Sequence, residues 1–171
     1  MDLALLVLRV VIGLLFAGHG AQKLFGVLGG GGLDETAGMF DRIGLRPSAV
    51  HARIAGTTEF MGGLLIAIGF LTPFAAAALI AVMAAAVATV HFQNGIWNTN
   101  RGYEYNLVLV AALFALCGVG AGSWSLDHAL AMHLSGTVWA LGALVVGLVG
   151  GGGAVIGGRT AAGHEPHPSG A

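Results

Sequence analysis

Long apolar stretches, interrupted by only a few ionisable side chains, constrain this chain more than any other feature of its sequence. The ionisable residues within these stretches or at their ends include Arg9, His19, Lys23, Glu59, His91 and Glu104. About 20 consecutive apolar residues are enough to span the hydrocarbon core of a bilayer. A charge inside such a stretch is costly and marks a candidate functional site. The pattern predicts a multi-pass protein of the cell membrane, in contact with the lipid bilayer.

Composition supports a membrane protein and excludes two other classes. Of the 171 residues, 56% are hydrophobic and 9% are charged, whereas soluble domains carry about 25% charged residues. A formal net charge of −1 provides no basic face for nucleic acid. Cys117 is the single cysteine, so the chain by itself has no dithiol chemistry.

Five apolar segments predict an all-α transmembrane helical bundle. Four of them form the expected core and cover residues 3–25, 49–71, 74–92 and 105–119. A last stretch, 134–156, is long enough for a fifth C-terminal span, although its glycines weaken it as an isolated helix. We therefore expect a four-helix core over 1–133, an additional span over 134–156 and a disordered polar tail over 157–171.

Arg9 and Glu59 form the first candidate constellation. Counted along the helices, Arg9 lies about two turns into the first span, and Glu59 lies near the middle of the antiparallel second span. We expect the two side chains to come within reach of each other. They then form either an ion pair that locks two spans or a proton carrier that acts through Glu59.

A second constellation gathers at the membrane boundary, where several spans bring polar side chains to the same end of the bundle. His19 and Lys23 are spaced i, i+4 and so share one helical face. The full set of candidate ligand-binding residues is His19, Gln22, Lys23, His91, Asn94, Asn98, Asn100, Tyr103 and Glu104. A convergent polar pocket at the mouth of a bundle is typical of a small-molecule site.

Three chemistries fit these residue types to different degrees. A quinone requires an apolar slot and a His, Tyr or Asn donor to a carbonyl oxygen, and all of these are present. A haem between His19 and His91 fits only by residue type, since nothing else in the sequence specifies one. A metal site of His19, His91 and Glu104 has no specific spacing, so no metal is predicted.

Four short segments are similar to the motifs of the DoxX family of small bacterial and archaeal membrane proteins. They are residues 8–26 with Gly18-His19-Gly20, residues 56–63 with Glu59, residues 91–105 and residues 122–127. The likeness covers residues 3–130 in order. It implies a four-helix membrane core and a link to redox systems, because the family takes its name from a subunit of an archaeal thiosulfate:quinone oxidoreductase. Mycobacterial members are associated with thiol redox and oxidative-stress partners.

The orientation in the membrane stays open. The loops on one side carry Lys23, Arg42, Arg46, Arg101 and Arg159, which predicts that this side is cytoplasmic. Membrane families related to DoxX tend to place the loop after the first span outside the cell, which is the opposite orientation.

Taken together, these patterns predict a membrane subunit of a redox system that interacts with quinone, with an oxidoreductase partner protein, or with both. No redox centre is encoded in the chain, so electrons would come from the partner. The alternatives are a non-enzymatic scaffold that anchors soluble redox or stress enzymes, and a small-solute permease. Glycine-rich faces on the last span also favour association with a second copy or with a partner.

Overall fold

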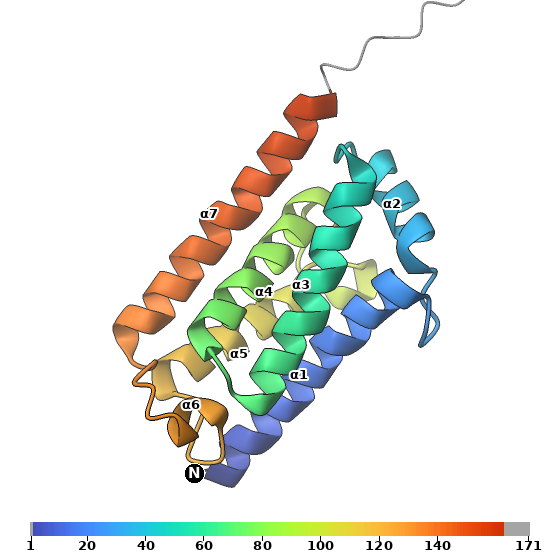
Figure 1. Cartoon of the computed structure of the whole chain (residues 1–171). Helices are drawn as coiled ribbons and strands as arrows, with labels where there is room; N and C mark the ends of the chain where they lie inside the picture. The colour runs from blue at the N-terminus through green and yellow to red at the C-terminus, as the bar shows by residue number, and fades with distance from the viewer. Residues whose placement is uncertain (1, 163–171) are drawn as a thin grey trace, which may run out of the picture.

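Every regular element of the computed structural model, which describes residues 2–162, is helical (Figure 1). The α-helices are α1 (Asp2–Phe25), α2 (Gly32–Arg42), α3 (Ser48–Ile68), α4 (Thr72–Ala86), α5 (Glu104–Val119), α6 (Leu126–Ala129) and α7 (Thr137–Ala162). A π-helical turn, η1 (Val87–His91), and a 3-10 turn, η2 (Phe92–Asn94), continue α4, and a second 3-10 turn, η3 (Asn98–Asn100), precedes α5.

Three helical stretches are long and apolar enough to cross a membrane: Asp2–Phe25, Thr72–Asn94 and Thr137–Ala162. α5 is apolar but has 16 residues. α3 has 21 residues and carries Arg53 and Glu59. The expected all-α bundle of membrane helices is confirmed, including an apolar helix at the C-terminal end.

The polar tail begins later than its composition suggests. α7 continues to Ala162, six residues beyond the end of the expected span, so residues 157–162 are helical. The remainder of the expected tail, 163–171, lies outside the described residues.

α1 and α3 pack with their backbones nearly in contact because glycines meet where the two helices cross. A Cβ atom on Gly13 would lie 2.5 Å from the carbonyl oxygen of Gly63. A Cβ atom on Gly20 would lie 2.3 Å from the backbone nitrogen of Phe60. Small residues permit this close approach in membrane bundles, and the contacts fix which residues of the two antiparallel helices lie level with each other.

α7 lies against α4 in the same manner, and Figure 1 shows it running along the outside of the bundle. A Cβ atom on Gly151 would lie 2.4 Å from the carbonyl oxygen of Ala81 and 2.9 Å from the Cβ atom of Ala84. The alanines of α4 therefore form a narrow seam with α7. The core between the helices contains Ile12, Phe16, Ile66, Leu79, Ile80, Leu113 and Leu116.

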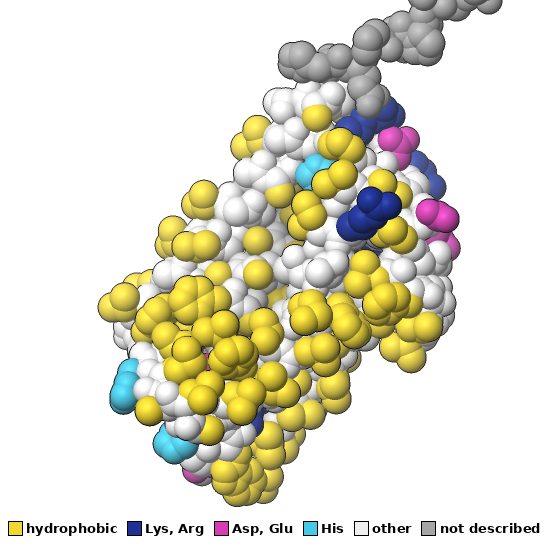
Figure 2. Space-filling model, in the orientation of Figure 1, with side chains coloured by type: hydrophobic (Ala, Val, Ile, Leu, Met, Phe, Trp, Pro, Cys, Tyr) yellow, Lys and Arg dark blue, Asp and Glu magenta, His cyan; other side chains and the backbone are white. Residues whose placement is uncertain are grey.

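Much of the outer surface is apolar. Large hydrophobic side chains are exposed along the long helices, for example Val11, Leu107 and Val149. Figure 2 shows hydrophobic side chains over most of one face, while most of the charged side chains on it gather toward the α2 end. Such a surface is suited to lipid on the sides of the bundle and to water and headgroups at its ends.

Candidate functional site

Most of the polar residues singled out in the sequence lie at the α2 end of the bundle. Several of them form hydrogen bonds that hold the adjacent loops in place. His19 Nδ1 donates a hydrogen bond to Gln22 Oε1 over 3.1 Å. Gln22 Nε2 in turn donates to the carbonyl oxygen of Leu28 over 2.9 Å. This chain of hydrogen bonds holds the loop that follows α1.

The loop between η2 and α5 is held by its own set of polar contacts. His91 Nδ1 and Asn94 Nδ2 donate to the carbonyl oxygen of Arg101 over 2.8 and 3.3 Å. Glu104 Oε2 accepts the backbone N–H of Asn98 over 3.0 Å. Since a carbonyl oxygen only accepts, His91 carries its proton on Nδ1 when neutral, and Nε2 is then free to accept a hydrogen bond.

Glu59 pairs with Lys23, and the expected Arg9–Glu59 pair does not form. The packing of α1 on α3 explains the difference. A Cβ atom on Gly56 would lie 3.3 Å from Lys23 Cβ, so this part of α3 lies level with the C-terminal end of α1. Arg9 is 14 residues earlier, about 21 Å away along the helix axis. Glu59 is 3% exposed and Lys23 is 24% exposed.

Arg9 belongs to a separate cluster at the α6 end. It is 2% exposed, and its Nη2 donates to the carbonyl oxygen of Trp124. Its Nε and Nη1 have no hydrogen-bond partner in the described part of the chain.

Asp127 is an important residue of this cluster that the sequence did not reveal. Its carboxylate accepts hydrogen bonds from Leu71 N (2.7 Å), Thr72 N (3.0 Å) and Thr72 Oγ1 (2.6 Å), and it interacts electrostatically with Arg9. Asp127 lies in residues 122–127, which are similar to a DoxX motif, and in the sequence Ser125-Leu126-Asp127-His128, which is typical of a helix cap. Ser125 Oγ does cap α6 by accepting a hydrogen bond from His128 N, and Asp127 is buried together with Ser125.

A groove of about 620 Å³ runs between α2, α3, α4 with η1, and α7. The Lys23–Glu59 pair lines it, together with His91 at the end of η1 and His51 in the first turn of α3. The remaining polar side chains in its lining are Thr58 and Thr89, and the other walls are apolar, including Met39 and Phe40 of α2. We call this the ion-pair groove. The volume is within the range of small-molecule sites.

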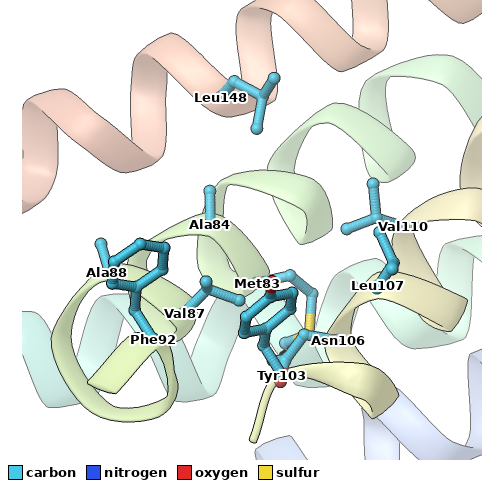
Figure 3. Close-up of a pocket in the computed structure, with 10 residues that line it drawn as sticks. All are labelled: Met83, Ala84, Val87, Ala88, Phe92, Tyr103, Asn106, Leu107, Val110 and Leu148. Carbon is cyan, nitrogen blue, oxygen red and sulfur yellow. Dashed lines mark hydrogen bonds between the residues drawn. The ribbon is translucent and has the colours of Figure 1, made fainter. Parts of the chain in front are cut away.

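A second cavity, of about 500 Å³, lies on another flank of α4, between η1, α5 and α7 (Figure 3). Tyr103 and Asn106 are the polar side chains of its lining, and Met83, Val110 and Leu148 form apolar walls. We call this the uncharged pocket. The π-helical turn η1 separates the two cavities, since Val87 and Ala88 face the pocket while Thr89 and Val90 face the groove. Such turns occur frequently at functional sites.

The candidate residues are thus divided among several places. Lys23, Glu59 and His91 share the ion-pair groove, and Tyr103 lies in the uncharged pocket. The others line neither cavity: Arg9, His19, Gln22, Asn94, Asn98, Asn100 and Glu104. Within residues 2–162, no cluster of three or more His, Cys, Asp or Glu side chains is arranged to hold a metal ion, so His19, His91 and Glu104 are not brought together as a ligand set.

Comparison with known proteins gives two uncharacterized relatives. One is the uncharacterized membrane protein Rv3486 of Mycobacterium tuberculosis, 28% identical over 134 residues that cover 72% of this chain and 78% of the relative. The other is an uncharacterized protein of Haemophilus influenzae, 31% identical over 83 residues, which are 48% of this chain and 55% of that protein. No solved structure matches the chain.

The family model named DoxX matches residues 4–92, just over half of the chain. The matched region contains α1 to α4 and η1, and therefore both members of the Lys23–Glu59 pair and His91. On this match, the chain is a membrane protein of the DoxX family.

Proposed function

We propose that this protein is a cell-membrane subunit of a redox system that binds a membrane-dissolved quinone in the ion-pair groove. The observation that supports this proposal is the position of the Lys23–Glu59 pair. Of the two ion pairs between described residues it is the less exposed one, and it borders a largely apolar cavity.

The groove offers what a quinone needs for binding. The ring and isoprenoid tail are apolar and suit walls made by Ala81, Ala85 and Val155. Each ring carbonyl accepts a hydrogen bond, which the ammonium group of Lys23 can donate. A groove that opens between helices within the bilayer can receive such a molecule directly from the lipid.

Protonatable side chains in the groove suit the chemistry of quinone reduction. A quinone becomes a quinol by taking up two electrons and two protons. An oxidoreductase partner protein would supply the electrons, and the groups that line the groove would transfer the protons. Lys23 and Glu59 are suited to this role, and His91 Nε2 can accept a hydrogen bond from a quinol hydroxyl.

Binding of a short-chain ubiquinone to the purified protein in nanodiscs tests the proposal. The test variants are His91→Ala, which removes a polar lining residue, and Ala154→Phe, which places a ring in the groove without touching the ion pair. His19→Ala is the matched control, because His19 lies at the same end of the bundle but lines neither cavity.

We expect His19→Ala to bind like the wild type and both groove variants to bind at least tenfold more weakly. Absence of binding by folded wild-type protein would contradict the quinone proposal. A scaffold that anchors soluble redox enzymes would then be the better explanation, and Glu59→Gln would leave partner recruitment intact.

A further inference from the structure

The uncharged pocket differs from the ion-pair groove in chemistry and position. None of the residues that line it is charged, and it extends inward from the membrane boundary, where Tyr103 and Asn106 lie, to Val110 and Leu148. Its rim is open, since Phe92 is 70% and Leu107 is 51% exposed. On a membrane helix bundle, such a rim faces lipid.

Asn106 is the feature that points to a ligand. The residue is 5% exposed, yet its side chain makes one hydrogen bond within the described structure, from Nδ2 to the sulfur of Met83 over 3.3 Å. A thioether is a weak acceptor, and an amide nitrogen carries a second hydrogen. A buried amide without full partners is costly, most of all where no water is available. The second N–H of the Asn106 amide can therefore donate a hydrogen bond to an acceptor that enters the pocket.

Tyr103 adds a second donor about one helical turn before Asn106. Its ring stacks on Phe92 with 6.3 Å between the centroids and an angle of 15° between the planes. In Figure 3 the rings of both residues lie beside the cavity, with Tyr103 close to Asn106. Tyrosine is enriched at the level of lipid headgroups and ester groups, so both donors lie where the ester carbonyls of a lipid are found.

Arg101 provides a charge in the loop that leads to the pocket. It lies two residues before Tyr103, in the loop at the membrane boundary, and its side chain is exposed. Its backbone oxygen is fixed by His91 and Asn94, while no hydrogen bond or ion pair joins its guanidinium group to another residue between 2 and 162. A guanidinium group at this level is suited to a phosphate.

We propose that the uncharged pocket binds a glycerophospholipid: one acyl chain along Met83, Val110 and Leu148, an ester carbonyl at Asn106 and Tyr103, and the phosphate at Arg101. An acyl chain suits a mainly apolar cavity without charged walls. The site is distinct from the proposed quinone groove, because η1 separates the two cavities.

Native mass spectrometry of the delipidated protein, titrated with phosphatidylglycerol or with diacylglycerol of the same acyl chains, tests this site. Ala88→Phe places a ring in the pocket, and Ala78→Phe is its matched control, because both alanines are exposed but Ala78 lines the ion-pair groove. Asn106→Leu removes the amide, and Arg101→Asn removes the guanidinium group while keeping a residue that tolerates the left-handed backbone of this position, φ 61°.

We expect the wild type and Ala78→Phe to hold one phosphatidylglycerol at least tenfold more tightly than diacylglycerol. Ala88→Phe and Asn106→Leu should weaken phosphatidylglycerol binding at least fivefold, and Arg101→Asn should remove the preference over diacylglycerol. Undiminished binding by Ala88→Phe, or equal binding of the two lipids by the wild type, overturns the proposal. Ubiquinone binding should be unchanged in Ala88→Phe, which separates this site from the quinone groove.

Discussion

Each end of the bundle contains a buried acid and a base close to it, but the two clusters differ in how far protein groups enclose them. At the α6 end, the carboxylate of Asp127 accepts three hydrogen bonds from Leu71 and Thr72 at the turn between α3 and α4. Arg9 donates to the backbone of Trp124 in the loop before α6. Protein groups therefore surround this cluster, and it ties α1 to two loops.

At the α2 end, the Lys23–Glu59 pair is open on one side. Lys23 is 24% exposed, and both residues border the ion-pair groove. The difference shows that a charge within a membrane helix is not by itself evidence of a binding site. The informative feature is whether its partners leave a face of the charged group accessible to a ligand.

Asp127→Ala should have the largest effect on stability and should identify the α6 cluster as structural. The substitution removes three hydrogen bonds and leaves Arg9 buried without an opposing charge. Each buried donor that loses its acceptor costs about 1–3 kcal/mol, so the loss of three hydrogen bonds should cost about 3 kcal/mol or more. Denaturant unfolding in detergent micelles measures the change, with Asp34→Ala, an exposed acid in α2, as control. A loss below about 1 kcal/mol would mean that the α6 cluster does not hold the loops together.

Lys23→Met should destabilise the protein by about 2 kcal/mol, less than the loss of Asp127, because Lys23 is partly exposed and water can reach Glu59 in its absence. The double variant Lys23→Met/Glu59→Met should lie within about 1 kcal/mol of the wild type, since replacing both partners of a buried pair by apolar groups is often neutral. The same unfolding measurement completes the double-mutant cycle. A double variant as unstable as Asp127→Ala would remove the distinction between the two ends.

The sequence predicts the helices well but not which charges meet. Apolar length and composition suffice for α1, α4 and α7, because a bilayer selects for exactly those properties. The predicted pairing of Arg9 with Glu59 was wrong because the position of a residue in a helix gives only its distance from the end of that helix. The glycine contacts between α1 and α3 set how far the two helices are offset along their axes, and so decide which residues lie side by side. Asp127 was missed because its partners, Leu71 and Thr72, are more than 50 residues away in sequence.

The two cavities also depend on tertiary structure. Their walls come from α4 with η1 and from α7, and their shapes follow from how closely Gly151 lets α7 approach Ala81. The sequence placed Lys23, His91 and Tyr103 in one convergent pocket and Glu59 with Arg9. The structure instead puts Lys23, Glu59 and His91 in one groove and Tyr103 in another pocket.

Glu59→Gln should separate ligand binding from stability at the α2 end. The amide keeps an oxygen for Lys23 and removes the negative charge, so the free energy of unfolding should change by less than about 1 kcal/mol. Ubiquinone affinity should fall about tenfold, which is about 1.4 kcal/mol of binding free energy. Calorimetric titration in nanodiscs measures it, with the exposed Glu35→Gln as control. Unchanged affinity would exclude the carboxylate charge from the binding site.

Glu104→Ala should have the smallest effect, because Glu104 closes an exposed loop through one hydrogen bond to the backbone N–H of Asn98. A solvent-accessible bond of this kind contributes about 0.5 kcal/mol. Hydrogen exchange at the Asn98 amide should become faster by a factor of about 2–3, while ubiquinone affinity stays at the wild-type value. Glu104 lies at the same end of the bundle as the Lys23–Glu59 pair but lines neither cavity. If its removal weakened quinone binding as strongly as Glu59→Gln, the ligand would have to contact the loop before α5. Access to the ion-pair groove would then not distinguish Glu59, the proposed ligand-binding acid, from Glu104.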